Sequence, residues 1–139
     1  MSAEENKADV EAIMNLRQQY MVAQGAGDAE GCLSFWCEDG VLMNPNEPAV
    51  VGKDALRSWY QKAFATFSID FTVTYDQIEV AGDWSFAHGK YGGTMVPKAG
   101  GEPIQDNGKF LEIHRRQPDG TWKWAYCMGS SDNPDAGTH

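Results

Sequence analysis

Glu112 and His114 form a candidate pair for proton chemistry. On an expected strand over 109–116 they stand two residues apart, so their side chains share one face, roughly 7 Å apart. A histidine titrates near neutral pH, and a neighbouring carboxylate can orient it or exchange a proton with it. The alternating Leu111 and Ile113 leave the opposite orientation open, in which these two apolar side chains fill the core instead.

Tyr20 is a candidate hydrogen-bond donor. It lies on the apolar stripe of an expected helix over 8–25, together with Val10, Ile13 and Leu16. Its hydroxyl could stabilise a developing enolate, a contact that is stronger in the transition state than in the ground state. The alternative is a core tyrosine whose hydroxyl finds a backbone partner.

His88 is a third candidate for moving protons. It shares strand parity with Trp84, Phe86 and Lys90, a set that we assign to an internal cavity. A histidine on a solvated sheet face is the alternative. Apart from the terminal residue, His88 and His114 are the only histidines and they lack ligand spacing, so no metal site is expected.

Cysteine usage indicates a reducing compartment. Cys32, Cys37 and Cys127 include no Cys-x-x-Cys pair and leave an odd thiol, so a disulfide framework is not expected and the cytoplasm is favoured. Cys127 shares parity with the small residues Ala125 and Gly129, which leave room inside a sheet. A buried inert thiol is favoured there over a nucleophile, because no neighbouring cation is identifiable.

The first half of the chain is predicted to be helical. The stripe over 8–25 ends at Gly25-Ala26-Gly27, and Asp28 then stands at the N-cap position of a short helix that reaches Trp36. A short strand over 41–43 follows. A third helix begins after Gly52, and its apolar side consists of Leu56, Tyr60, Ala63, Phe64 and Phe67.

The second half is predicted to form strands. Apolar and polar residues alternate over 69–75, which is typical of a half-buried strand. Further strands are expected over 84–96, 109–116 and 121–129, separated by a loop over 97–108 and a turn over 117–120. Helices followed by strands predict an α+β fold, with the helices on one face of a curved sheet.

Composition excludes several classes of partner. The 139 residues carry 11 Lys+Arg against 20 Asp+Glu, for a net charge of −9 and a pI of about 4.6. Nucleic acids and anionic membranes favour basic surfaces, so neither is an expected partner. No run approaches the roughly 18 apolar residues of a membrane span. We predict one domain over 1–139, with an ordered core over about 8–130.

The order of these elements resembles the nuclear transport factor 2-like superfamily. The resemblance rests on "QYMVAQGAGDAEGCLSFWCEDGVLMNP", "VVGKDALRSWYQKAF" and "GKFLEIHRRQPDGTWKW", and the last two look most like its polyketide-cyclase-like (SnoaL-like) branch. It implies a cone-shaped, curved antiparallel sheet with three helices on its concave side, a cystatin-like roll. It further implies an apolar pocket inside the cone and a homodimer through the outer face of the sheet.

The resemblance also implies roles for individual residues. Ketosteroid isomerase members use a helix-one tyrosine, a second acid and an aspartate base. Tyr20 matches that tyrosine, Glu112 falls near the second acid, and Asn44 stands where the base would be. An amide cannot accept the substrate proton, so either another group is the base or the pocket only binds.

The arrangement of strands in the family further implies which side chains face the inside of the cone. Phe110, Glu112 and His114 would point into the cone, and Trp36, Trp59, Phe86 and Cys127 would join Phe110 in lining the pocket. The opposite stripe of the last strand is then an outer, dimer-forming face, although its plain interpretation is core. That stripe comprises Trp122, Trp124, Tyr126 and Met128.

Two functions remain open at this point. The first is a cofactor-independent isomerase, cyclase or dehydratase-type lyase acting on an apolar carbonyl compound. In it, Tyr20 and Asn44 donate hydrogen bonds while His88, His114 or Glu112 carries protons. The second is a non-catalytic ligand carrier or dimeric association module, which the missing aspartate base favours.

Overall fold

Three helices precede most of the sheet in a computed structural model that describes residues 3–133. They are α1 (Ala3–Gly25), α2 (Ala29–Leu33) and α3 (Lys53–Thr66). The side chain of Asp28 accepts a hydrogen bond from the Gly31 amide, as its predicted N-cap position requires. In α3, Leu56, Tyr60 and Phe64 recur every four residues and are all buried.

The sheet has six strands, most of them antiparallel. Their order across the sheet is β2-β1-β6-β5-β4-β3, and only the β1–β6 pair is parallel among the described strands. This arrangement confirms the predicted α+β class. The strands are β1 (Trp36–Met43), β2 (Val50–Val51), β3 (Phe67–Ala81), β4 (Trp84–Pro97), β5 (Ile104–Arg116) and β6 (Trp122–Ser131).

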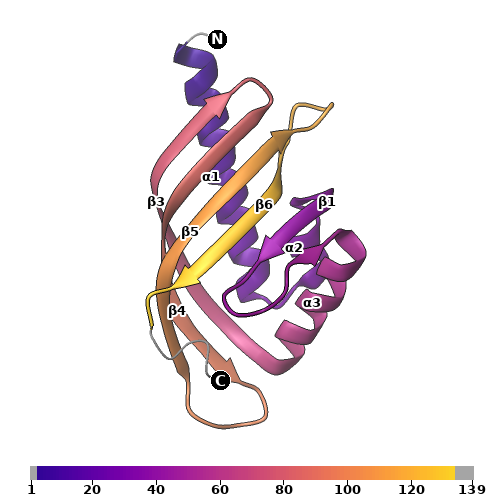
Figure 1. Ribbon diagram of the computed structural model, residues 1–139, viewed down its shortest axis with the longest axis vertical. Coiled ribbons are helices and arrows are strands. Elements are labelled where there is room, and N and C mark those ends of the chain that lie inside the picture. The colour runs from indigo at the N-terminus through magenta and orange to yellow at the C-terminus, as the bar shows by residue number, and fades with distance from the viewer. Residues whose placement is uncertain (1–2, 134–139) are drawn as a thin grey trace.

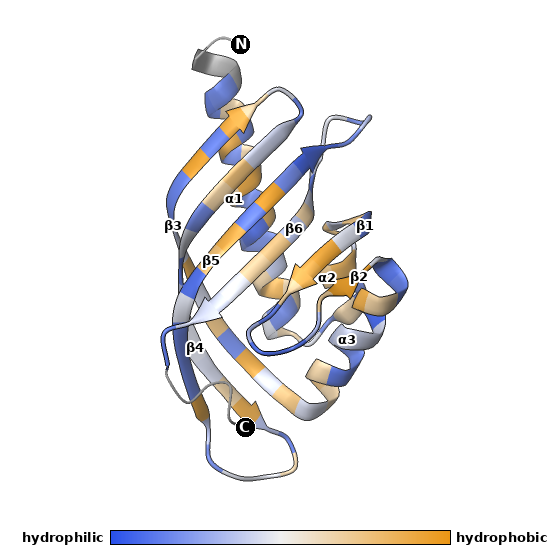
Figure 2. Ribbon diagram, in the orientation of Figure 1, coloured by the Kyte–Doolittle hydropathy of each residue, from blue (hydrophilic) through white to orange (hydrophobic). Residues whose placement is uncertain are grey.

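The long strands curve around the helices (Figure 1). Helix α1 crosses behind β4, β5 and β6 on the concave side, while α2 and α3 close the end of the sheet beside β1. Apolar residues alternate with polar ones along the strands in Figure 2. The core therefore lies between the concave face and the three helices.

A bulge in β3 contributes to this curvature. The pairing of β3 with β4 shifts between Tyr75 and Gln77, next to Gly89 of β4. A Cβ atom at Gly89 would collide with the carbonyl oxygen of Thr74, so only glycine permits this close approach. The bend lets Tyr75 lie at the centre of the concave face.

Several element boundaries differ from the predictions. Strand β5 begins at Ile104, inside the predicted loop over 97–108, because its first half pairs with the end of β4. Strand β1 begins at Trp36, whereas the sequence pattern predicts that the second helix reaches this residue, and the pattern does not predict the two-residue β2. Within the described residues, no helix is long and apolar enough to cross a membrane.

Candidate functional site

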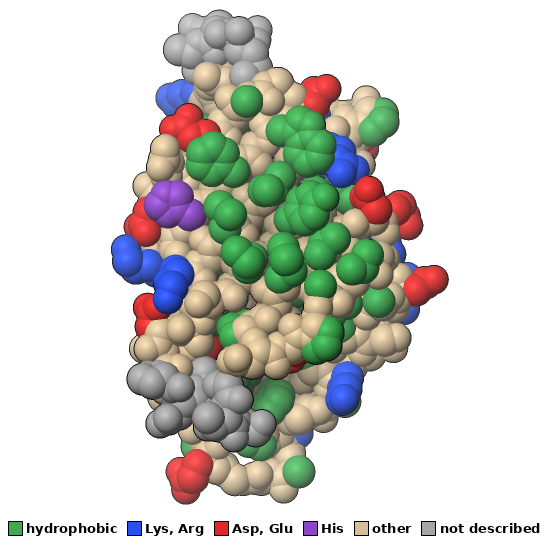
Figure 3. Space-filling model, in the orientation of Figure 1, with side chains coloured by type: hydrophobic (Ala, Val, Ile, Leu, Met, Phe, Trp, Pro, Cys, Tyr) green, Lys and Arg blue, Asp and Glu red, His purple; other side chains and the backbone are tan. Residues whose placement is uncertain are grey.

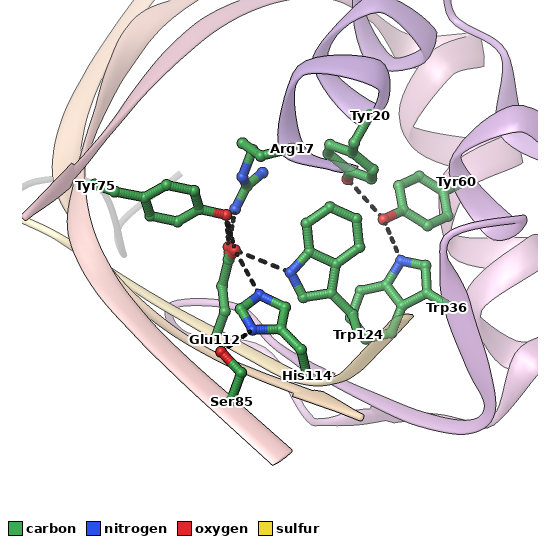
Figure 4. Close-up of polar contacts among 9 residues, drawn as sticks. All are labelled: Arg17, Tyr20, Trp36, Tyr60, Tyr75, Ser85, Glu112, His114 and Trp124. Atoms are coloured by element: carbon green, nitrogen blue, oxygen red, sulfur yellow. Dashed lines mark hydrogen bonds and ion pairs between the residues drawn. The ribbon is translucent and has the colours of Figure 1, made fainter. Parts of the chain in front are cut away.

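A buried ion pair lies at the centre of the concave face (Figure 4). Nη2 of Arg17, from α1, donates to Oε2 of Glu112, from β5, over 2.5 Å. The Glu112 side chain is completely buried and that of Arg17 is only 12% exposed. Charges of this kind are costly to remove from water, and each is retained in the interior because the other compensates it.

Three further side chains surround the Glu112 carboxylate. The hydroxyl of Tyr75 donates to Oε1 over 2.8 Å, and the indole Nε1 of Trp124 donates to the same oxygen over 2.9 Å. Nε2 of His114 lies 3.6 Å from Oε1. On its other side, Nδ1 of His114 lies 3.4 Å from Oγ of Ser85, which fixes the orientation of the ring.

The ionisation of Glu112 follows from these neighbours. Burial acts to raise the pKa of Glu112, but the charge of Arg17, the proximity of His114 and the hydrogen bond from Trp124 outweigh it and hold the pKa at about 2. Burial, followed by the charge of Glu112, raises the pKa of Tyr75. At neutral pH the cluster therefore holds a carboxylate, a guanidinium and a neutral phenol.

Aromatic rings surround the guanidinium. The Cζ atom of Arg17 lies 5.4, 5.3 and 5.0 Å from the ring centres of Tyr20, Phe110 and Trp124. Such contacts hold a cation in place through the negative faces of the rings. The Nε atom of Arg17 is buried and has no hydrogen-bond partner among the described residues, so one strong donor of the cluster remains available.

Tyr20 belongs to a second, adjoining network. Its hydroxyl shares a hydrogen bond of 2.7 Å with that of Tyr60, which also accepts one from Nε1 of Trp36 over 2.9 Å. Burial, followed by the proximity of Tyr60, raises the pKa of Tyr20 well above its ordinary value. Tyr20 is therefore a neutral phenol whose hydroxyl is already bonded to another side chain.

The predicted orientation of the 109–116 strand agrees with the structure. Phe110, Glu112 and His114 are buried, whereas Leu111 is 39% exposed. The alternative that apolarity favours, with Leu111 and Ile113 in the core, is wrong because Arg17 compensates the buried carboxylate. Cys127 lies beside Glu112 in the sheet, and burial raises its pKa to about 12, so its thiol is protonated.

The predicted stripe of the last strand is only half correct. Trp122 and Trp124 are buried in the core, while Tyr126 and Met128 are exposed on the outer face. The pairing of β5 with β6 shifts at Ala125, where an extra residue changes the parity of the strand. Trp122 and Trp124 therefore do not belong to an outer face.

The predicted orientation of the 84–96 strand is wrong. Trp84 and Phe86 are more than 40% exposed, and His88 is also exposed and hydrogen-bonded to Gln77. The inward positions are instead taken by Ser85 and Ala87. The small inward residues leave room for the aromatic side chains of neighbouring elements, so neither Phe86 nor His88 reaches the interior.

Asn44 also lies away from the central cluster. It follows β1 in a surface loop, where its Nδ2 donates to Oε1 of Glu47 over 3.1 Å. Trp59, a predicted pocket wall, is partly buried and donates to the same oxygen through Nε1 over 2.8 Å. The structure thus brings Asn44 and Trp59 together through Glu47, outside the Arg17–Glu112 cluster.

Sequence reasoning missed Arg17, Tyr75 and Ser85. Arg17 could have been noticed as a cation within the apolar stripe, between Leu16 and Tyr20. Tyr75 is the last inward residue of the alternating 69–75 segment and precedes the bulge. Nothing in the sequence marks Ser85, because its role depends entirely on the orientation of β4.

An open pocket of about 500 Å³ lies near the C-terminal end of α1. None of the predicted site residues lines it. Its walls are Gly25, Ser68, Ile69, Asp70, Thr94 and Val96. No group of three or more potential metal-ligating side chains was found within the described part of the chain.

The fold and the enclosed cluster define a protein with a nuclear transport factor 2-like architecture. The SnoaL-like domain model matches residues 17–125, and the chain belongs to this family. A search of curated proteins found no significant match.

Similar solved structures agree with this assignment. A ketosteroid isomerase-like protein from Erwinia carotovora atroseptica is 28% identical, with a TM-score of 0.82 over 96% of this chain and 100% of that chain. A nuclear transport factor 2-like superfamily protein from Salmonella enterica is 16% identical, with a TM-score of 0.80 over 96% and 98% of the two chains. A nuclear transport factor 2-like protein with a cystatin-like fold from Novosphingobium aromaticivorans is 20% identical, with a TM-score of 0.74 over 93% and 85%.

Proposed function

We propose that this domain binds a small apolar carbonyl compound or phenol on its concave face, with the ligand oxygen at Arg17. The observation that carries the proposal is the buried Nε donor of Arg17, which has no partner among the described residues. Unsatisfied buried donors are costly, and a ligand oxygen would remove this cost. The rings of Tyr20, Phe110 and Trp124 around the guanidinium favour an apolar ligand body.

Ligand binding is tested by calorimetric titration with phenylcyclohexanone and nitrophenol. The double variant Arg17→Met/Glu112→Gln removes both charges together, so that neither is left buried and unpaired. We expect the parent to bind at least one probe and the double variant to bind it at least tenfold more weakly. Arg115→Met, a change on the outer face, is the matched control and should bind like the parent. Equal binding by the double variant and the parent would refute the proposal.

A specific observation also favours catalysis at this site. His114 and Glu112 lie side by side, with Nε2 and Oε1 separated by 3.6 Å, next to the donors Arg17 and Tyr75. We propose that Nε2 of His114, a buried atom without a hydrogen-bond partner among the described residues, takes the proton removed beside the carbonyl, while the free Nε donor of Arg17 stabilises the resulting enolate oxygen. Glu112, held ionised by Arg17, is too weak a base for this step, and its carboxylate instead stabilises the positive charge that His114 gains. The ketosteroid isomerase-like name of the Erwinia protein supports a reaction of this class.

Catalysis is tested by following deuterium incorporation beside the carbonyl of aryl and alicyclic ketones by NMR. We expect the parent to accelerate exchange and His114→Gln to reduce the rate by about 10²–10⁴-fold, the usual contribution of a positioned base. His88→Gln, which changes an exposed histidine on β4, should retain the parent rate. Binding without any acceleration of exchange would instead identify the non-catalytic carrier.

We further propose that a second copy of the chain covers the outer face of the sheet. Apolar side chains gather there in Figure 3. Phe86, Ile113 and Tyr126 are adjacent across β4, β5 and β6, and the row continues through Val41 and Val51 of β1 and β2. Exposed apolar patches of this kind mark interaction surfaces, and an uncharged apolar row can pack against its own copy.

A further inference from the structure

A second polar group lies on the concave face, toward the other end of β5. The carboxylate of Asp106 accepts a hydrogen bond from the hydroxyl of Tyr91 over 3.0 Å and another from Oγ of Ser131 over 2.6 Å. Both donors are neutral, in contrast to the arginine that pairs with Glu112. A carboxylate offers about four acceptor positions, so Asp106 retains capacity for a further donor.

Asp106 and Glu112 face the same side of the sheet. They are six residues apart on β5, which corresponds to a Cα separation of about 20 Å. Their neighbours across β6 are Ser131, beside Gly108, and Cys127, beside Glu112. The two polar groups therefore lie along one strip of the concave face rather than on opposite faces.

The middle of this strip is open at Gly129. Gly129 is paired with the inward-facing Phe110, so a side chain at this position would also point inward. An added Cβ at Gly129 would meet no described atom within 4 Å. By contrast, a Cβ at the neighbouring inward Gly108 would collide with the ring of Tyr91. Free space thus adjoins Phe110, one of the rings that hold Arg17.

The lining of the strip is aromatic. The rings of Tyr75 and Phe110 are 5.6 Å apart, and those of Phe71 and Tyr91 are also 5.6 Å apart. Burial, followed by the charge of Asp106, raises the pKa of Tyr91, so its hydroxyl remains a donor to that carboxylate. An apolar floor therefore joins a cationic donor at one end to an anionic acceptor at the other.

We propose that the ligand of this domain is elongated and carries polar groups at both ends. Its carbonyl or phenolic oxygen binds at Arg17, its apolar body lies over Gly129, and a hydroxyl or amine at its far end donates to Asp106. The proposal rests on the proposed function, because it extends the ligand from the same Arg17 site. Gly129 is then a specificity-determining residue, since any larger side chain there would occupy the space of the ligand body.

The test compares two ketones by calorimetric titration: phenylcyclohexanone and its analogue with an aminomethyl group on the far side of the phenyl ring. We expect the parent to bind the aminomethyl ketone more tightly, by roughly 10–100-fold, as a charge-assisted hydrogen bond allows. Asp106→Asn should abolish this preference and leave the affinity for the plain ketone unchanged. Asp76→Asn, a change on the outer side of β3, is the matched control and should retain the preference.

A second pair of variants tests the space at Gly129. Gly129→Leu should weaken binding of both ketones at least tenfold, whereas Ser130→Leu, whose side chain points to the other face, should not. A preference for the aminomethyl ketone that survives Asp106→Asn, or unchanged binding in Gly129→Leu, would overturn the elongated-ligand proposal while leaving the Arg17 site intact. Failure of the parent to bind either ketone would overturn the elongated-ligand proposal, and failure to bind nitrophenol as well would also overturn the proposed function.

Discussion

The ionisation of Glu112 depends on Arg17, a residue far away in the sequence. A carboxylate that is completely buried would ordinarily be protonated, yet the pKa of Glu112 is about 2 because Arg17 compensates the cost of burial. The two residues come from opposite ends of the sequence and from different kinds of element. A buried ion pair is often no more stabilising than apolar side chains of similar volume, so its presence here favours a functional role.

Removing one partner of this pair should be costly. Glu112→Gln leaves the Arg17 guanidinium buried without its anion, and we expect the free energy of unfolding in urea to fall by about 3–5 kcal/mol. Arg17→Met/Glu112→Gln should recover a large part of this loss, because no buried charge is then left uncompensated. The single variant Arg17→Met completes the comparison. If the double variant loses as much free energy of unfolding as Arg17→Met and Glu112→Gln lose together, the two charges do not interact.

The pH dependence of folding stability tests Glu112→Gln in a second way. The pKa of Glu112 in the folded state, about 2, lies below its ordinary value of 4.5. Its contribution to stability is therefore present above pH 4.5 and is lost as the pH falls toward 2. In Glu112→Gln, the free energy of unfolding should therefore change less with pH in this interval than in the parent. An unchanged pH dependence would mean that other groups cause the loss of stability in acid.

At the scale of elements, strand parity depends on bulges. The inward direction of Phe110, Glu112 and His114 agreed with the expectation from the family resemblance. The extra residue at Ala125 reverses the inward and outward alternation of side chains halfway along β6. The sequence of β6, with large side chains at every second position, does not indicate this reversal. Bulges arise from the fit between neighbouring strands, so a pattern within one strand cannot locate them.

Helix α1 is attached to the sheet by a second ion pair, eight residues before Arg17. Nη1 and Nη2 of Arg116 donate to the two carboxylate oxygens of Asp9 over 2.9 and 2.8 Å, and Nε1 of Trp122 lies within 3.3 Å of one of them. Both charged side chains are largely shielded from water. Two ion pairs on one side of the helix thus set its position over the concave face.

Asp9→Asn should therefore destabilise the protein by about 1–2 kcal/mol, since it weakens a bidentate, charge-assisted contact. Urea unfolding followed by tryptophan fluorescence measures this change and also reports on Trp122. Glu11→Gln, which changes an exposed residue on the same helix, should stay within about 0.5 kcal/mol of the parent. If the two variants lower the free energy of unfolding equally, Asp9 does not hold α1 on the sheet.

At the scale of the whole molecule, the two faces of the sheet have different partners. Helices cover the concave face (Figure 1), where the polar cluster is buried, whereas the convex face leaves large apolar side chains exposed (Figure 3). On β4, β5 and β6 they include Trp84, Phe86, Leu111, Tyr126 and Met128. Monomeric proteins rarely leave such a patch uncovered, which is the basis of the proposed dimer.

Light scattering should find the parent protein as a dimer and Tyr126→Asp as a monomer. Tyr126 lies within the apolar row, and a carboxylate buried there would lack a partner. Gln61→Asp places the same charge on an exposed residue of α3, away from the outer face of the sheet, and should leave the dimer intact. A monomeric parent would contradict the proposal directly.

The sequence by itself determined the α+β class, the three helices and the run of long strands, because these follow from local periodicity and helix-capping chemistry. It also determined Asp28 as an N-cap and, through the family resemblance, the inward direction of Glu112 and His114. The tertiary structure alone decided that Arg17 and Tyr75 converge on Glu112, and that Phe86 and His88 face outward. The reason is physical: convergence depends on the path of the chain and on bulges between strands, and neither is encoded in the spacing of residues within one element.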